Sequence, residues 1–163
     1  MCFKLFNGPH KLSEKKRKLA ITYAMHFIGT WYSWGGDDPS GFDCSGYIVE
    51  VLQAVGLLGR KEDLTADGLY RRFKNYEVEK PYAGCLVFWG SNKKKTHVEL
   101  CIDEYHSIGA SGGGRFVKTK EDAIKANAFI KIRPIDSRTG KKWFVDPFLK
   151  FECIKIPKGY VVG

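Results

Sequence analysis

The sequence predicts an α+β fold, in which N-terminal helices pack on a central antiparallel β-sheet. Two observations support this prediction. Before residue 77, apolar residues recur every three to four positions in three segments, as they do on the buried face of a helix. Short runs of β-forming residues then follow one another, starting at 85–89. Helices first and strands afterwards are typical of α+β proteins.

Three helices are predicted in the N-terminal half. Residues 12–28 carry an apolar stripe opposite lysines and arginines, and residues 64–76 form a shorter helix. The helix between them begins after Asp43, a good N-cap residue, and Gly56 is placed to end it in a left-handed conformation. The stripe of the first helix comprises Leu12, Leu19, Ala20, Tyr23, Ala24, Phe27 and Ile28.

The C-terminal half is predicted to supply the strands. One further helix is expected there at about 119–127, and Lys93–Lys95 is expected to be a mobile polar loop. The predicted strands cover 85–89, 97–102, 105–111, 129–133 and 151–156.

Length and composition indicate a single globular domain over residues 1–163. Hydrophobic residues make up 44% and charged residues 28%, which is ordinary for a soluble protein. No apolar run is long enough to span a membrane. The N-terminal apolar run is too short for a secretory signal, and the basic cluster follows it. We therefore expect synthesis in the cytoplasm without a signal peptide.

The chain is strongly basic, with a formal net charge of +9 and a pI near 9.3. This charge favours a polyanionic partner, such as an anionic cell-wall polymer or a nucleic acid. A solvated basic surface without any such partner would explain the same charge. The charge alone does not choose among these interpretations.

The cysteines predict neither a disulfide framework nor a zinc site. They are five in number, widely spaced, and include no CxxC pair. No other set of histidines, cysteines or carboxylates has the spacing of a metal site. We therefore expect no metal and no cofactor.

Cys44 is the candidate nucleophile. It lies in the first turn of the predicted helix after Asp43, where unpaired N–H groups and the helix dipole stabilise a thiolate. These effects predict a pKa well below the free value of about 8.5. A free cysteine is also a common core residue, but the polar and glycine-rich flanks of Cys44 favour the catalytic interpretation.

A cysteine nucleophile needs a base and a group that orients the base. His97 is the candidate base, because it opens a predicted strand directly after a polar loop. His10 lies in the polar N-terminal arm, and His26 lies inside the first helix, where a surface or capping role is expected. His106 belongs to the next predicted strand.

Four segments together resemble the successive motifs of the NlpC-type cell-wall peptidases, which have a papain-like fold. They are Tyr-Ser-Trp-Gly-Gly at 32–36, Phe-Asp-Cys-Ser-Gly at 42–46, Ala-Gly-Cys-Leu-Val-Phe-Trp at 83–89 and His-Val-Glu-Leu at 97–100. The resemblance covers residues 12–114, and the order and spacing of all four motifs agree with it.

This resemblance implies a cysteine endopeptidase that cuts the stem peptide of peptidoglycan, typically between D-glutamate and a diamino acid. It implies that Cys44 is the nucleophile and His97 the base. It also implies that Tyr32 helps to form the oxyanion environment and that Ser45 lines the substrate cleft. Peptidoglycan and anionic wall polymers are then the expected partners, and nucleic acid is the less favoured one.

The third catalytic residue departs from the family pattern. Twelve positions after the base the family usually has a His, where this chain has Gly109, and two positions after the base it usually has Gly, where this chain has Glu99. In a hairpin with 97 opposite 109, Glu99 faces the same side as His97, and Gly109 leaves room for its carboxylate. Strand parity places His106 on the other face unless the register slips. Glu99 is the preferred candidate, and His106 and a water-assisted Cys–His dyad remain alternatives.

Three functions compete. The first is the endopeptidase, which the apparent lack of an export signal and of a separate wall-binding module assigns to a phage lysin or a virion-associated enzyme. The second is an amidase or acyl transferase on the same fold, like the CHAP amidases. The third is a basic domain without catalytic activity that binds wall polymer or nucleic acid.

Overall fold

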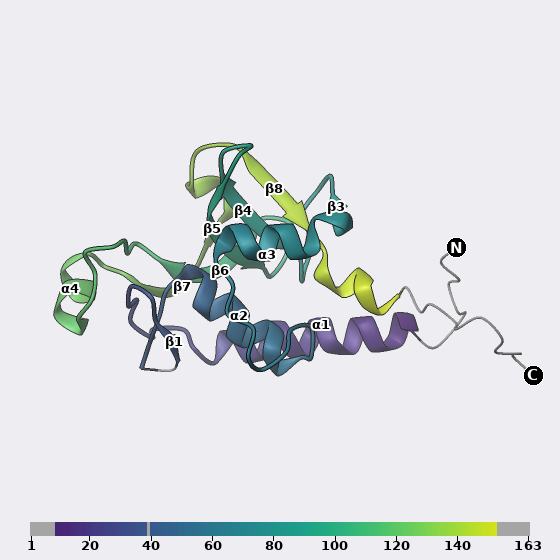
Figure 1. The fold of residues 1–163 in the computed structure, drawn as a ribbon, viewed down its shortest axis with the longest axis horizontal. Coiled ribbons are helices and arrows are strands. Elements are labelled where there is room, and N and C mark those ends of the chain that lie inside the picture. The colour runs from purple at the N-terminus through teal and green to yellow at the C-terminus, as the bar shows by residue number, and fades with distance from the viewer. Residues whose placement is uncertain (1–8, 39, 153–163) are drawn as a thin grey trace, which may run out of the picture.

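A computed structural model describes residues 9–38 and 40–152 and confirms the α+β class (Figure 1). In Figure 1, α1 and α2 run next to each other along one side of the sheet, and α3 crosses in front of it. The helices are α1 (Pro9–Met25), α2 (Cys44–Ala54), α3 (Ala66–Phe73) and α4 (Lys120–Lys125), with short 3-10 helices η1 (Lys74–Tyr76), η2 (Ile135–Ser137) and η3 (Pro147–Phe151).

The central sheet has six antiparallel strands in the order β3-β8-β4-β5-β6-β7, and β1 and β2 form a separate two-stranded sheet. The strands are β1 (Asp37–Asp38), β2 (Gly41–Phe42), β3 (Glu77–Val78), β4 (Leu86–Gly90), β5 (Lys95–Cys101), β6 (His106–Ser111), β7 (Phe129–Pro134) and β8 (Lys142–Val145).

Helix α2 packs against α1 and against strands β5 and β6, and its ends are those that the sequence predicts. The Asp43 carboxylate accepts a hydrogen bond of 2.7 Å from the backbone N–H of Gly46 and caps the helix. Gly56 has φ +77° just beyond the last turn, a conformation that glycine adopts without strain. The packing and the caps together fix the position of the helix start relative to the sheet.

The two faces of the sheet carry different cores, because successive side chains of a strand point to opposite faces. The main core lies under the helices and includes Phe88 and Val98. The smaller core on the other face includes Trp89 and Cys101. His97 is paired with Trp89 across β4 and β5, and therefore points to the face of the smaller core.

Strands β5 and β6 are paired at one end only. Leu100 lies opposite Ile108 and Cys101 opposite Ser107, and no pair is formed between the earlier part of β5 and the later part of β6 in these two fully described strands. Helix α2 contacts both strands. The start of β5, where His97 lies, is therefore open on its β6 side.

The first helix differs from its prediction. It runs from Pro9 to Met25 rather than over 12–28, and Leu12, Leu19 and Ile28 of the predicted apolar stripe are exposed. The rest of the predicted stripe does lie in or against the core, with Ala20 and Ala24 fully buried. Charged side chains also hold the helix, because Arg17 forms an ion pair with Asp146 and Lys16 donates a 2.6 Å hydrogen bond to the carbonyl of Val55. The apolar stripe predicted that the lysines and arginines of this helix face solvent, which is wrong for Arg17.

Two expectations about the C-terminal half also differ from the structure. Strand β8 was not predicted. A strand was predicted over 151–156, but Phe151 belongs to η3, and residues 153–156 lie outside the described residues. Lys95 is not in a mobile loop, because it begins β5 and is only 3% exposed. Its ammonium lies 3.6 Å from the centre of the Trp143 ring.

None of the helices in the described part of the chain has the length and apolarity needed to cross a membrane.

Candidate active site

Cys44 is the first residue of α2 and is partly exposed. The backbone N–H groups of Ser45, in the same helical turn, and of Val98, in β5, act to lower the pKa of its thiol. Since Val98 directly follows His97, the thiol lies at the junction of the helix start and the end of β5 that is not paired with β6. The structure thus brings Cys44 and His97 to the same junction.

His97 and Glu99 form a hydrogen-bonded pair along β5. The distance between His97 Nε2 and Glu99 Oε1 is 2.8 Å, and the exposed fractions of the two residues are 8% and 1%. The ring of Trp89 lies 5.5 Å from the imidazole, centre to centre. Packing on one side and the carboxylate on the other therefore fix the orientation of the imidazole.

The Glu99 carboxylate is fully engaged by its neighbours on β6 and β7. The Ser107 hydroxyl donates a hydrogen bond of 2.6 Å to Oε2, and Arg133 Nη2 donates one of 3.2 Å to Oε1. Ser107 and Arg133 lie opposite each other in the sheet. A buried carboxylate with these partners holds a fixed position beneath His97.

The register of the β5–β6 hairpin differs from the prediction that placed 97 opposite 109. Leu100 lies opposite Ile108, so the same register extended towards the start of β5 puts Glu99 opposite Gly109. The predicted consequence nevertheless agrees with the structure, because a Cβ atom at Gly109 would lie 2.4 Å from Glu99 Cγ. Any larger residue at this position would displace the carboxylate.

The charge states of the pair follow from its surroundings. Burial raises the pKa of the Glu99 carboxyl, but the hydrogen bonds from His97 and Ser107 and the charge of Arg133 outweigh it, so the pKa lies below its ordinary value. Burial lowers the pKa of His97 below its ordinary value, although Glu99 acts to raise it. At neutral pH the pair is thus a neutral imidazole beside an ionised carboxylate.

The Cys44 thiol does not have the low pKa that its position at a helix start predicts. Burial and the charge of Asp43 raise the pKa of Cys44 to about 11, against the hydrogen bonds from Val98 and Ser45, which lower it. The residue that caps the helix is itself a carboxylate, and its charge opposes the helix dipole at the thiol. Cys44 is therefore a protonated thiol at neutral pH.

Tyr32 and Ser45 lie close to Cys44. Tyr32 is 4% exposed, and its ring packs against the backbone at Gly113. Burial, followed by the nearby Cys44 and Asp43, raises the pKa of the Tyr32 phenol, so it remains a hydrogen-bond donor. The Ser45 hydroxyl donates a 3.2 Å hydrogen bond to Asp43 Oδ1 and is partly exposed at the start of α2.

The other histidines lie elsewhere. His106 Nδ1 is 3.0 Å from Asp103 in the turn between β5 and β6. His26 directly follows the end of α1, and its Nδ1 is 2.8 Å from the carbonyl oxygen of Thr22 in that helix. The side chain of His10 lies outside the described residues.

Comparison with known proteins decides the family. The NlpC/P60 family model matches residues 29–146. The chain belongs to the NlpC/P60 family. The expected family and the α+β, papain-like fold are therefore both confirmed. The motif resemblance seen in residues 12–114 was thus to the right family.

Two curated relatives of the NlpC/P60 chain are bacterial proteins. Protein P54 of Enterococcus faecium is 38% identical over 101 residues, which cover 60% of this chain and 19% of P54. The probable peptidoglycan endopeptidase LytE of Bacillus subtilis (strain 168) is 33% identical over 95 residues, which cover 58% of this chain and 27% of LytE. The chain thus spans less than a third of the length of either relative. Neither relative supports the expected phage origin, which stays a prediction.

A solved structure agrees with the fold of the NlpC/P60 chain. The crystal structure of the NlpC/p60 domain of the peptidoglycan hydrolase SagA has 26% sequence identity and a TM-score of 0.57. The match covers 79% of this chain and 97% of that domain.

Several residues around the NlpC/P60 site were missed from the sequence. Two of them could have been found from the sequence. Ser107 lies on the same face of its strand as Gly109, and Trp89 belongs to the motif at 83–89. Arg133 and Arg138 lie beyond the part of the chain that the motifs cover, and the guanidinium of Arg138 is 5.5 Å from the centre of the Trp89 ring. Arg138 follows η2 in a loop, where no periodicity indicates the direction of a side chain.

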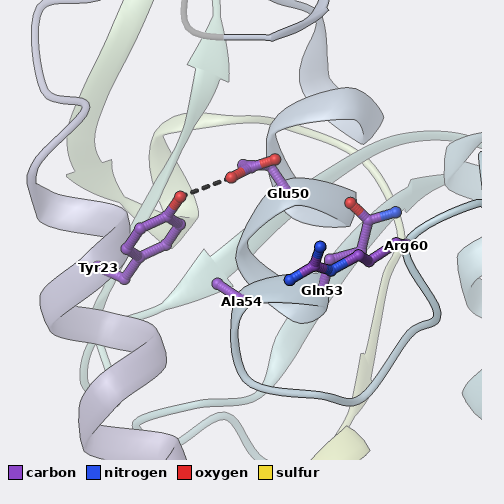
Figure 2. Close-up of a pocket in the computed structure, with 5 residues that line it drawn as sticks. All are labelled: Tyr23, Glu50, Gln53, Ala54 and Arg60. Carbon is purple, nitrogen blue, oxygen red and sulfur yellow. Dashed lines mark hydrogen bonds between the residues drawn. The ribbon is translucent and has the colours of Figure 1, made fainter.

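A pocket away from these residues lies between α1, α2 and the loop after α2 (Figure 2). In Figure 2 the Tyr23 hydroxyl points to the Glu50 carboxylate, and they are 2.5 Å apart. Gln53 Nε2 donates hydrogen bonds to the carbonyls of Gly59 and Glu62. Tyr23, Glu50 and Gln53 of this pocket thus have hydrogen-bond partners within the protein. In the described ranges 9–38 and 40–152, no group of three or more histidines, cysteines or carboxylates is placed to hold a metal ion.

Proposed function

We propose that this NlpC/P60 chain is a cysteine endopeptidase that hydrolyses a peptide bond of the peptidoglycan stem. The observation that supports this most strongly is the 2.8 Å contact between His97 and Glu99, next to a cysteine at a helix start. LytE is named a probable peptidoglycan endopeptidase and SagA a peptidoglycan hydrolase, which supports the same substrate class. The enzyme would then act on the cell wall.

The hydrogen bond to Glu99 sets the tautomer of His97. An ionised carboxylate only accepts hydrogen bonds. His97 Nε2 must therefore carry the ring hydrogen and donate a hydrogen bond to Glu99. The lone pair of the neutral imidazole is then on Nδ1. Nδ1 is the atom that accepts the thiol proton of Cys44 as the sulfur attacks.

The attack starts from a neutral thiol and a neutral imidazole. Cys44 Sγ bonds to the scissile carbonyl carbon while its proton passes to His97 Nδ1, and the carbonyl oxygen becomes an oxyanion. Glu99 stabilises the imidazolium that forms. The backbone N–H of Cys44 at the start of α2 and the phenol of Tyr32 are the donors assigned to the oxyanion.

The intermediate then breaks down in two stages. The imidazolium of His97 gives its proton to the departing amine, the C–N bond breaks, and a thioester remains on Cys44. In the second stage His97 takes a proton from water, the hydroxide adds to the thioester carbonyl, and Cys44 leaves with the proton returned by His97. The products are a carboxylic acid and an amine, with the free enzyme restored.

The bond that we assign is the one between D-glutamate and the diamino acid. Its support is the motif resemblance, which includes Ser45 as a residue that lines the cleft. Ser45 lies one position from the nucleophile and is partly exposed, which agrees with a substrate contact. An amidase or acyl transferase would use the same thioester and differ in the bond cut or in the acceptor.

Hydrolysis of a synthetic stem peptide tests this function. The wild type should release a new amino group and two fragments, and Cys44→Ala should release neither. Cys85→Ala is the matched control, because Cys85 is fully buried in the smaller core and should be dispensable for chemistry. A peptide that remains intact with the folded wild type, or that is cut equally well by Cys44→Ala, would refute the proposal.

A further inference from the structure

We propose that Arg138 binds a free carboxylate of the substrate beside the scissile bond. The inference rests on the proposed function and names a specificity-determining residue for it. Arg138 lies in the loop between η2 and β8, outside the family motifs noted in the sequence.

Two contacts place the guanidinium of Arg138 on the face of the sheet that carries His97. Its Cζ lies 5.5 Å from the centre of the Trp89 ring, and that ring lies 5.5 Å from the imidazole of His97. Its Nη2 lies 3.4 Å from Ser111 Oγ at the end of β6. The guanidinium of Arg138 and the imidazole of His97 thus both lie beside the ring of Trp89.

Arg138 has little protein to bind there. Its contact with Ser111 is long for a hydrogen bond, and its Nε is buried without an acceptor. In the described ranges 9–38 and 40–152, no carboxylate lies within 4.0 Å of its guanidinium, whereas Arg17 is paired with Asp146 and Arg133 with Glu99. A half-buried cation with unused donors is therefore available to an external anion.

The charge of Arg138 reaches both reacting groups. It lowers the pKa of Cys44 and the pKa of His97, although burial has the larger effect on each. An anion bound to Arg138 would therefore lie close to the scissile bond and not in a distant part of the cleft.

The chemistry of the proposed substrate supplies such an anion. D-Glutamate has two carboxyl groups, and only one of them forms the amide that is cut. The other remains a free carboxylate a few bonds from the scissile carbonyl. The planar fork of an arginine matches a carboxylate with two parallel hydrogen bonds, which a lysine cannot reproduce.

Two stem peptides that differ in one group test the assignment. In one peptide the second carboxyl group of D-glutamate is free, and in the other it is converted to an amide. We expect kcat/KM of the wild type to favour the free carboxylate by roughly 10- to 100-fold, as for a hydrogen bond to a charged group. In Arg138→Gln this preference should shrink towards one, because only the peptide with the free carboxylate loses its contact with the guanidinium.

Two further variants make the test specific. Arg138→Lys keeps the charge without the fork and should keep part of the preference. Arg71→Gln makes the same charge change at an exposed arginine of α3 and should leave the preference intact. Because both peptides meet the same Cys44 and His97, a changed pKa of either group cancels in the ratio.

The outcomes separate the two proposals. If the wild type cuts neither peptide, the endopeptidase function is wrong, and the assignment of Arg138 is wrong with it. If the wild type cuts both peptides and the ratio is the same in Arg138→Gln, only the assignment of Arg138 is overturned. If Arg138→Gln does not fold, Arg138→Lys decides: a preference smaller than that of the wild type supports the assignment, and a preference equal to that of the wild type overturns it.

Discussion

At the scale of single residues, the Cys44 thiol lies between groups that move its pKa in opposite directions. The helix start and two backbone N–H groups favour the thiolate, whereas burial and Asp43 disfavour it and raise the pKa to about 11. His97 is neutral because burial lowers its pKa. These pKa shifts predict that nucleophile and base are both uncharged before the substrate binds, without a preformed thiolate–imidazolium pair.

Alkylation of Cys44 by iodoacetamide tests this charge state. The rate should rise about tenfold per pH unit across the neutral range, because the reactive thiolate is the minor form far below a pKa of about 11. Asp43→Asn keeps the helix cap and removes the charge, so it should lower the pKa and speed the reaction at pH 8. A rate that is constant between pH 5 and 8 would show a preformed ion pair instead.

The pH dependence of hydrolysis tests the state of His97. The base must be neutral, and burial holds its pKa below the ordinary value of 6.5. We therefore expect kcat/KM to be retained at pH 6.5 and to fall only as the pH drops further and the imidazole gains a proton. An acid limb centred above pH 7 would mean that Glu99 stabilises the imidazolium more than burial destabilises it.

Glu99 is predicted to orient His97 and to stabilise its charged form. Glu99→Gln keeps the shape of the site but removes the charge, so the loss of kcat should be smaller than the roughly 10²–10⁴-fold loss expected for His97→Ala. Ser107→Ala is a milder control, since it removes one of the hydrogen bonds to Glu99. Activity near wild type in Glu99→Gln, together with its loss in a folded His106→Ala, would identify His106 as the third residue.

At this scale the sequence predicted the residues whose neighbours are close along the chain. Asp43 caps α2, and Glu99 lies two positions from His97 on the same strand face. Arg138 could not be found in this way, because its approach to Trp89 depends on how η2 and its loop fold back over the sheet.

At the scale of elements, α1 is held by an ion pair that periodicity did not predict. Arg17 donates hydrogen bonds of 3.0 and 2.9 Å to the two carboxylate oxygens of Asp146, which lies just after β8 and is fully buried. Tyr82 donates a further bond of 2.6 Å to the same carboxylate. Apolar periodicity locates a helix but gives no information about such long-range pairs, so the exposed Leu12 and Leu19 were assigned to the wrong face.

Asp146→Ala should therefore destabilise the fold strongly. It leaves the partly buried Arg17 without its partner, which costs about 3–5 kcal/mol in comparable sites. Urea unfolding followed by tryptophan fluorescence measures the loss. Asp136→Ala is the control, because it breaks an ion pair with Lys142 in which the Asp136 side chain is 94% exposed, and it should change stability little. Equal losses in both variants would contradict the structural role of Arg17.

At the scale of the whole molecule, the sheet order brings distant segments to one site. Strands β5, β6 and β7 supply His97, Ser107 and Arg133, and α2 supplies Cys44 where β5 and β6 separate. The α+β class was predictable because helices and strands are segregated along the chain. The hairpin register was not, because two registers place the same residues on the same face and differ only in which pairs lie opposite each other.

Mass analysis of the fragments released from purified peptidoglycan tests the central claim most directly. If Cys44 attacks the stem peptide as proposed, the wild type should release fragments that end in D-glutamate and leave fragments that begin with the diamino acid, and Cys44→Ala should produce neither. Fragments cut between the glycan and the peptide, or the same fragments from Cys44→Ala, would contradict the account.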